Sequence, residues 1–138
     1  MRIAFAIAVM LAGPALAETV VATRTIRPQE IIGASDVKLE NVDVPGAHVK
    51  LENVIGLEAQ YALYPGRAVM RGALAEPAVV ERNQFVVLVY QTGGLRIVTD
   101  GRALDRGAVG DRIRVMNVNS RTSLFGTISE DGTILVSN

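Results

Sequence analysis

The chain has 138 residues and a formal net charge of zero, because 14 lysines and arginines balance 14 aspartates and glutamates. A neutral chain has no electrostatic reason to bind nucleic acid. The sequence contains no cysteine and one histidine, which excludes zinc sites, iron–sulfur sites and disulfides. Its hydrophobic fraction of 49% comes mainly from Val, Ile, Leu and Ala, and a composition of this kind favours a folded β protein over disorder.

Residues 1–17 have the pattern of a cleaved secretory signal peptide. Arg2 supplies the positive start, residues 3–11 are apolar without interruption, and Ala15 and Ala17 are small residues at the positions that signal peptidase reads. The alternative is a membrane anchor, but a span needs about 20 apolar residues and this run is much shorter. We therefore expect export to the periplasm, cleavage after Ala17 and no membrane span in the mature chain.

Residues 18–77 consist of short apolar runs separated by turn residues, which predicts a first β module. Residues 64–67, with Pro65 and Gly66 at their centre, predict a turn. Residues 33–37 resemble a single helical turn with Ser35 as its N-terminal cap. Glu76-Pro77 marks the expected end of the module. The expected strands span residues 20–25, 39–44 and 57–63.

One hexapeptide, Val-Lys-Leu-Glu-Asn-Val, occurs twice, at residues 37–42 and at residues 49–54. Two such copies would suit a repeat architecture. The surrounding residues argue against that alternative, because the first copy leads into a strand that stops at Pro45 and the second leads into Gly56, as a helical turn ended by glycine would. We expect the two copies to differ in structure, since context overrides the propensity of so short a segment.

Residues 78–138 predict a second module, a small antiparallel β-barrel or sandwich. Residues 85–90 are continuously apolar, which favours a strand buried on both faces. Turns are expected at Gly93-Gly94, at Asp100-Gly101 and at Asp131-Gly132, the last being a strong hairpin signal. The expected strands span residues 85–90, 95–99, 112–115, 123–128 and 134–136.

No set of residues has the spacing of a catalytic or metal-binding site, so we expect neither enzymatic activity nor a cofactor. His48 lies beside a Pro-Gly turn, which predicts a solvated loop histidine and not the base of a catalytic triad. Asp100, Asp105 and Asp111 lack calcium-loop spacing and are interpreted as turn residues. Glu76 and Glu81 could be paired catalytic carboxylates, but a charged linker explains them without a sugar-binding platform of aromatic residues.

Four arginines of the second module alternate with apolar residues along the expected strands. Guanidinium groups on one sheet face could present paired donors to carboxylates or to an open strand edge. The alternative is a solvated face whose charges protect the strands from aggregation. The residues are Arg96, Arg102, Arg112 and Arg114.

The first module resembles the SAF domain, a β-clip module, and the second resembles the C-terminal region of the flagellar basal-body P-ring formation proteins, the FlgA family. The likeness covers residues 19–138 in the order of that family. Asn83 stands where the family usually has glycine, and longer members carry a further N-terminal domain. The first likeness rests on Arg27-Pro28, Ile32, Ser35-Asp36-Val37, Val54-Ile55-Gly56, residues 65–69 and Leu74. The second rests on residues 85–90, 93–95, 101–104, Gly107, 110–115 and 117–120.

The resemblance implies a periplasmic assembly chaperone of the bacterial-type flagellum, without catalysis, that binds the P-ring subunit before it polymerises around the rod. Strand addition is one binding mode that a β protein offers. The alternatives are a pilus or secretion-system assembly factor and a carbohydrate-binding SAF module. Tyr, Met and Arg are enriched at interfaces. Our candidate contact residues are Tyr64, Arg67, Met70, Arg71, Tyr90, Arg96 and Arg114.

Overall fold

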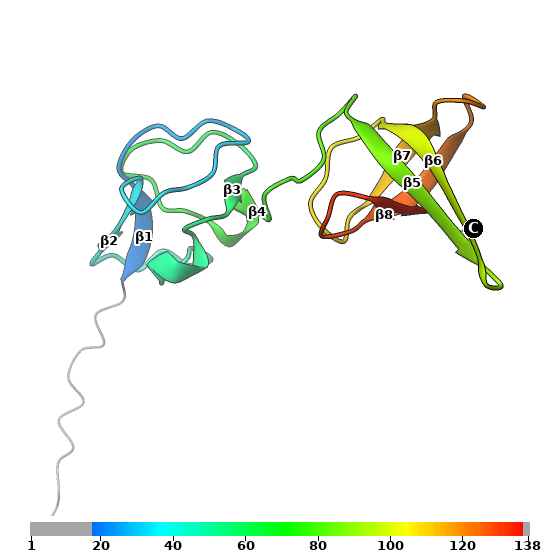
Figure 1. Cartoon of the computed structure of the whole chain (residues 1–138). Helices are drawn as coiled ribbons and strands as arrows, with labels where there is room; N and C mark the ends of the chain where they lie inside the picture. The colour runs from blue at the N-terminus through cyan, green and yellow to red at the C-terminus, as the bar shows by residue number, and fades with distance from the viewer. Residues whose placement is uncertain (1–17, 137–138) are drawn as a thin grey trace, which may run out of the picture.

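The computed structural model describes residues 18–136, which form two β-rich modules with separate hydrophobic cores (Figure 1). The first core is drawn from residues 20–73 and the second from residues 80–134. The expected signal peptide at residues 1–17 lies outside the described residues. The module boundary after Pro77 remains a prediction, which the two separate cores support.

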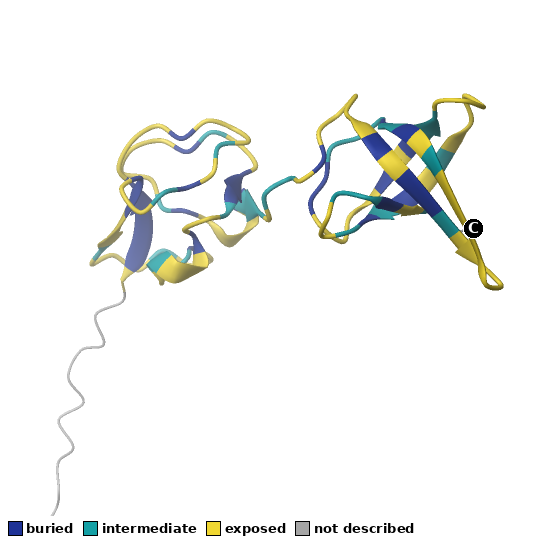
Figure 2. Ribbon diagram, in the orientation of Figure 1, coloured by how far each residue is buried: buried dark blue, intermediate teal, exposed yellow. Residues whose placement is uncertain are grey.

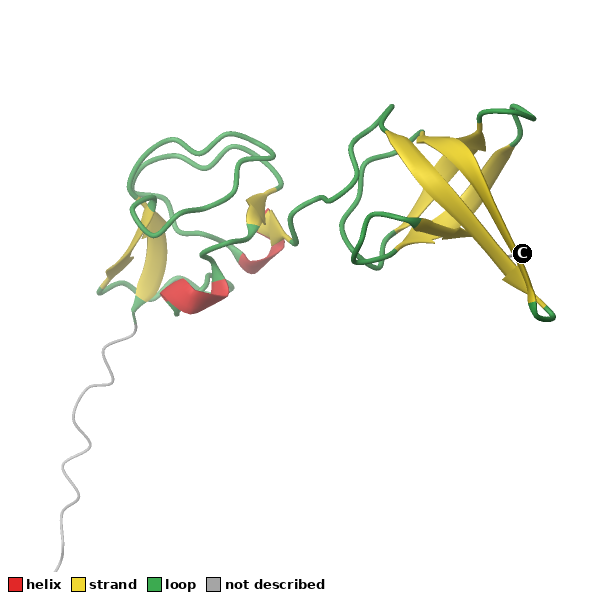
Figure 3. Cartoon of the chain, viewed as in Figure 1, coloured by secondary structure: helices red, strands yellow, loops and turns green. Residues whose placement is uncertain are grey.

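The first module contains four short strands, two 3₁₀ helices and long connecting loops (Figure 3). β1 pairs with β2 and β3 pairs with β4, both antiparallel. Isolated bridges, such as that between Ile26 and Leu63, tie the loops together around the core. The SAF resemblance of this module remains a prediction. Its elements are β1 (Thr19–Ala22), β2 (Val37–Glu40), η1 (Leu51–Asn53), β3 (Glu58–Ala59), η2 (Arg71–Ala73) and β4 (Leu74–Ala75).

The repeated hexapeptide adopts two structures, as expected. Its first copy begins as β2, which pairs with β1, whereas its second copy contains η1 and is followed by Gly56 at a φ of 88°. In the first copy Val37 joins the core, and in the second copy Val54 does. Different residues of the same hexapeptide therefore face the core, and the repeat is not an architectural unit.

Three expectations for the first module are wrong. The strand expected over residues 39–44 begins and ends earlier, because β2 runs over Val37–Glu40 and residues 41–44 lie in no strand. Residues 33–36 form a β-turn that leads directly into β2, so there is no helical turn capped by Ser35. The side chain that serves this turn is Asp36, whose Oδ2 accepts a 2.9 Å hydrogen bond from the Gly33 N–H. The strand expected over residues 57–63 is limited to β3, because the backbone beyond it bends.

The second module is a closed barrel in the order β5-β6-β7-β8-β9, which confirms the mostly β fold and decides for a barrel over a sandwich. Neighbouring strands are antiparallel, except that β9 closes the barrel by pairing parallel to β5. Fully buried Leu88, Val115, Ile128 and Ile134 fill it. The strands are β5 (Phe85–Thr92), β6 (Leu95–Ala103), β7 (Arg112–Asn117), β8 (Ser123–Ile128) and β9 (Ile134–Val136).

Two expectations for the barrel are wrong. β5 is not buried on both faces, since Phe85 is 65% exposed and Val87 is 40% exposed, and the alternation is visible along the strand (Figure 2). No turn occurs at Asp100-Gly101, because β6 continues through both residues. A Cβ on Gly101 would lie 2.6 Å from Cγ of Leu88, so glycine is required here for close packing and not for a turn.

Candidate functional site

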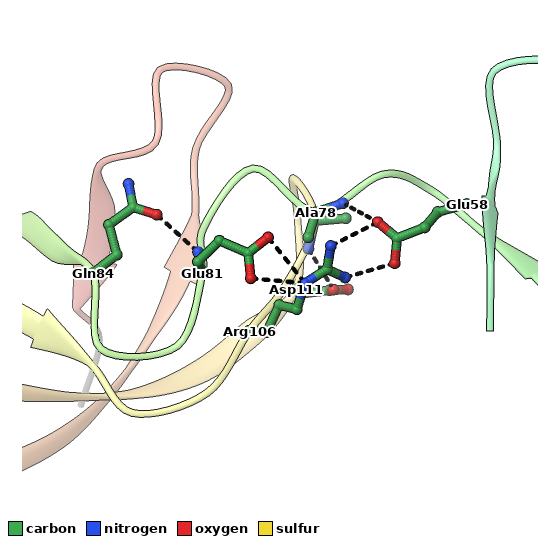
Figure 4. A network of polar contacts seen from close by, with 7 residues as sticks. Glu58, Ala78, Glu81, Gln84, Arg106 and Asp111 are labelled. Carbon is green, nitrogen blue, oxygen red and sulfur yellow. Dashed lines mark hydrogen bonds and ion pairs between the residues drawn. The ribbon is translucent and has the colours of Figure 1, made fainter. Parts of the chain in front are cut away.

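Arg106 and Glu58 form an ion pair between the two modules, here called the junction pair (Figure 4). Nη1 and Nη2 of Arg106 lie 2.6 and 2.8 Å from the two carboxylate oxygens of Glu58, the bidentate geometry of a strong charge-assisted contact. Nε of Arg106 lies 3.0 and 3.1 Å from the oxygens of Glu81. One guanidinium thus holds a carboxylate of β3 and a carboxylate at the end of the linker.

Backbone hydrogen bonds fix both members of the junction pair. The loop after β6 is held to the linker because Gly107 N–H donates to Val80 O at 3.0 Å and Val80 N–H donates to Gly107 O at 3.1 Å. Glu58 lies in β3, and its Oε2 also accepts a 3.2 Å hydrogen bond from Ala78 N–H. Both modules and the linker therefore meet at one carboxylate.

The turn at residues 81–84 leads from the junction into β5. Gln84 Oε1 accepts a 2.8 Å hydrogen bond from Glu81 N–H, which closes the turn. Asn83 has a φ of 69°, in the left-handed region. This fits its position, where the family usually has glycine, because asparagine tolerates that region better than most residues. The turn fixes Glu81 beside Arg106, so Glu81 is part of a defined contact and not only of a charged linker.

The junction pair stays ionised because its hydrogen bonds outweigh its burial. Glu58 is only 3% exposed, and the side chain of Arg106 is 24% exposed. Burial alone would raise the pKa of a carboxyl, but the hydrogen bonds from Arg106 hold the pKa of Glu58 below its usual range. The same contact raises the pKa of Arg106. The arrangement is that of a structural salt bridge and not of an acid–base site.

A polar cleft of about 340 Å³ lies beside the junction pair. Its walls come from the linker, from the loop that carries Arg106 and from the loop that carries Gln29. Within residues 18–136, no three His, Cys, Asp or Glu residues gather as metal ligands would. The cleft is therefore a feature of the module boundary, and the charged side chains of the junction pair beside it are already paired.

His48 does not fit the expectation of a solvated loop histidine. Its Nε2 is buried and has no hydrogen-bond partner in the described part of the chain. Its backbone is held between β1 and the segment that carries Val69, donating to Val69 O at 2.9 Å and accepting from Val20 N–H at 2.8 Å. Burial and the nearby charge of Arg71 lower its pKa, so the neutral imidazole is favoured.

The arginines of the barrel are mostly engaged with their own module. The guanidinium of Arg102 lies 4.9 Å from the ring centroid of Phe85, and that of Arg112 lies 5.0 Å from the ring of Phe125. Arg114 pairs with Asp105 through two hydrogen bonds of 3.1 Å. For Arg102, Arg112 and Arg114 these contacts argue against a free donor surface.

The candidate contact residues do not gather at one place. Tyr64 is 59% exposed, and its turn ends against β1, where Gly66 N–H donates to Ala22 O at 2.8 Å. Tyr90 and Arg96 lie on the β5–β6 hairpin of the other module. β1 and that hairpin are well separated in Figure 1. The structure therefore distributes Tyr64, Arg67, Met70 and Arg71 to the first module and Tyr90, Arg96 and Arg114 to the barrel.

Sequence reasoning missed the two residues that join the modules. Glu58 lies in an unremarkable apolar run, and Arg106 precedes a glycine in an expected turn. The signal that could have found them is the isolated charge of Glu58 within an apolar strand, since a charged residue at such a position needs a partner. Its partner is 48 residues away in the sequence, which no local pattern reveals.

A family model described as a chaperone for flagella basal body P-ring formation matches residues 17–136, nearly the whole chain. The chain belongs to this family. The match confirms the resemblance to the FlgA family that residues 19–138 indicated. Among curated relatives, the flagellar protein FlgA of Rhizobium meliloti (strain 1021) is 40% identical over 129 residues, covering 88% of this chain and 77% of that protein. The flagellar protein FlgA of Agrobacterium fabrum is 35% identical over 130 residues, covering 89% and 80%.

Solved FlgA structures have the same fold. Salmonella FlgA in open form superposes with a TM-score of 0.75 at 21% identity, over 86% of this chain and 59% of that chain. The flagellar protein FlgA of Thermotoga maritima gives a TM-score of 0.62 at 22% identity, over 88% of this chain and 45% of that chain. The chain thus spans about half the length of these two proteins. No helix in residues 18–136 is long and apolar enough to cross a membrane.

Proposed function

We propose that this chain is a periplasmic chaperone that binds the flagellar P-ring subunit before the subunit polymerises around the rod. The observation that carries the proposal is the match of residues 17–136 to the P-ring formation chaperones. A subunit that must polymerise only at the rod carries edges and apolar patches that would aggregate earlier. Reversible covering of such a surface is the task that a non-catalytic β protein can perform.

The proposed location follows from residues 1–17, whose sequence predicts a signal peptide removed after Ala17. In the periplasm the mature chain would meet the exported P-ring subunit. We propose no catalytic activity, in keeping with the family's description as chaperones.

Binding of the P-ring subunit is tested by a pull-down with both partners folded, using chain purified from the periplasmic fraction. We expect a complex at micromolar concentration. Deleting the gene should abolish swimming while the rod still forms, and a plasmid copy should restore motility. Failure of the folded proteins to associate, or normal P-rings in the deletion strain, would contradict the proposal.

The seven candidate contact residues remain part of this proposal. Tyr64 and Arg67 lie together in one exposed turn of the first module and make a compact pair for testing. Alanine at both positions should weaken the complex if the first module contributes contacts. Unchanged binding and motility would remove them from the contact surface. The pilus, secretion and carbohydrate alternatives lose support, because the family match extends over both modules.

A further inference from the structure

β6 has one edge that is only partly covered. It pairs with β5 along the pairs from Phe85–Arg102 to Thr92–Leu95, but it pairs with β7 only through Gly101, Arg102 and Ala103. The β5–β6 hairpin consequently projects from the barrel (Figure 1). Residues 95–99 of β6, on the side away from β5, are here called the open edge.

The backbone groups of the open edge can be assigned from the ladder. Val118 N–H donates to Asp100 O at 3.0 Å, so the backbone of Asp100 points away from β5. Every second residue of an antiparallel strand points the same way, so the N–H and C=O groups of Arg96 and Val98 also do. Neither residue has a backbone partner on that side within residues 18–136.

The open edge lacks the usual protection against strand pairing. Native edges carry prolines, bulges or several charges. Here three apolar side chains are exposed instead, Leu95 at 57%, Ile97 at 46% and Val98 at 56%. Arg96 is the only charged residue in residues 95–99. Such an edge is chemically suited to an extended polypeptide, the one ligand that supplies alternating N–H and C=O groups.

An apolar cavity of about 180 Å³ opens on the inner face next to the edge. Its lining includes Leu88, Ile97, Leu124 and Val136, together with Tyr90. Alternate side chains of an added strand would point toward this face. One apolar side chain of the incoming segment would therefore reach the cavity while its backbone pairs with β6.

The charges beside the edge favour a partner of opposite sign. Arg96 and Arg121 form no ion pair among residues 18–136, and Asp100 is the single acidic residue of β6. Arg121 belongs to the turn whose Asn119 side chain contacts Thr99. A second copy paired edge to edge about Ile97 would bring two Arg96 side chains to diagonal positions, about 7–8 Å apart, where like charges repel.

We propose that the open edge of β6 binds an extended segment of the P-ring subunit as an added strand, with one apolar residue in the cavity and an acidic residue near Arg96. This inference rests on the proposed function, because that function supplies the partner. It goes further by naming the binding mode and the residues that make it.

The test compares two valine-to-lysine variants in the full chain purified from the periplasm. Val98→Lys adds a charge beside the open edge, whereas Val87→Lys, the matched control, adds it on the neighbouring strand β5 opposite Asp100. We expect Val98→Lys to weaken binding to the P-ring subunit at least about tenfold and Val87→Lys to change it less than about twofold. Circular dichroism verifies that both variants fold.

Backbone pairing is measured separately by amide hydrogen exchange in the wild-type chain. The amides of Arg96 and Val98 should exchange quickly in the free protein and become protected in the complex. Unchanged exchange at both positions, or equal affinity of Val98→Lys and wild type, would overturn the edge proposal while leaving the proposed function intact. Loss of self-association in Val98→Lys would assign the edge to a second copy and overturn the edge proposal too. A wild-type chain that does not bind the subunit at all would overturn both proposals.

Discussion

Arg106 connects the first module, the linker and the barrel through one side chain. Its guanidinium contacts Glu58 and Glu81, and its neighbour Gly107 pairs with Val80. A second arginine, Arg24, acts similarly within the first module, where it lies 2.7 Å from both Asp36 and Glu30. In both clusters the planar fork of arginine contacts two carboxylates. Backbone N–H groups also donate to Asp36 and Glu30 beside Arg24, and to Glu58 beside Arg106.

The barrel core leaves no room for a side chain at Gly101. In Gly101→Ala the new Cβ would lie 2.6–2.7 Å from three carbons of Leu88, so the core must shift. We expect the free energy of unfolding to fall by about 1–3 kcal/mol, as in other overpacked cores. Chemical denaturation measures the change.

Gly72→Ala is the matched control for that substitution. Gly72 lies in η2, its φ is not positive, and a methyl group added to it would meet nothing within 4 Å beyond its chain neighbours. Its replacement should leave the free energy of unfolding unchanged within about 0.5 kcal/mol. Equal stability of Gly101→Ala and Gly72→Ala would contradict the packing explanation.

Among the elements, the turn before β5 fixes where the barrel begins. Asn83 N–H donates to Ala103 O at 2.8 Å, so the turn also secures the end of β6. This bond requires Asn83 to keep its positive φ of 69°. The turn therefore depends on the backbone conformation of Asn83 as well as on the Gln84 side chain that closes it.

The free energies of unfolding of Asn83 variants should reflect how easily each residue adopts a positive φ. Asn83→Gly should keep or raise the free energy of unfolding, because glycine adopts this conformation without strain. Asn83→Val should lower it by about 1–2 kcal/mol, since a β-branched residue is strained there. Thermal unfolding of the three proteins gives the order, and a valine variant as stable as the glycine variant would disprove it.

Strand positions were more predictable from sequence in the barrel than in the first module. β8 and β9 coincide with the expected residues 123–128 and 134–136, because Gly132 at a φ of 79° completes the hairpin that Asp131-Gly132 predicts. In the first module, β3 is limited to two residues where seven were expected. Its chain is held by isolated bridges rather than continuous ladders, and alternation of side chains cannot reveal those.

At the scale of the whole molecule, the junction pair should control how the two modules are held together. In Arg106→Ala, Glu58 keeps only the hydrogen bond from Ala78 N–H, and a buried carboxylate that has lost its cation costs about 3–5 kcal/mol. We expect the modules to separate, which solution X-ray scattering would record as a larger radius of gyration. Arg114→Ala is the control, since Arg114 pairs only with Asp105 of its own module.

Acid should also separate the modules, because protonation of Glu58 breaks the junction pair. The separation should need a lower pH than the protonation of an ordinary glutamate, since the pKa of Glu58 is lowered. The pKa of Glu58 lies below its usual 4.5, so the joined state binds fewer protons than the separated state. The contribution of the pair is therefore complete above about pH 4.5 and is lost as the pH falls through the lowered pKa. Scattering from wild type should match at pH 7 and pH 5, and a separation already complete at pH 5 would contradict the assignment.

The sequence by itself determined the β class, the division of the strands by Gly, Pro and Asn turns, and the family. The β class and the turns depend on local alternation and backbone conformation, which neighbouring residues specify, whereas the family followed from the resemblance of the motifs. Only the tertiary structure decided that the backbone of β3 stops being a strand after Ala59, and that Glu58 meets Arg106. Both outcomes depend on partners far away in the chain, whose burial and hydrogen bonds outweigh local preference.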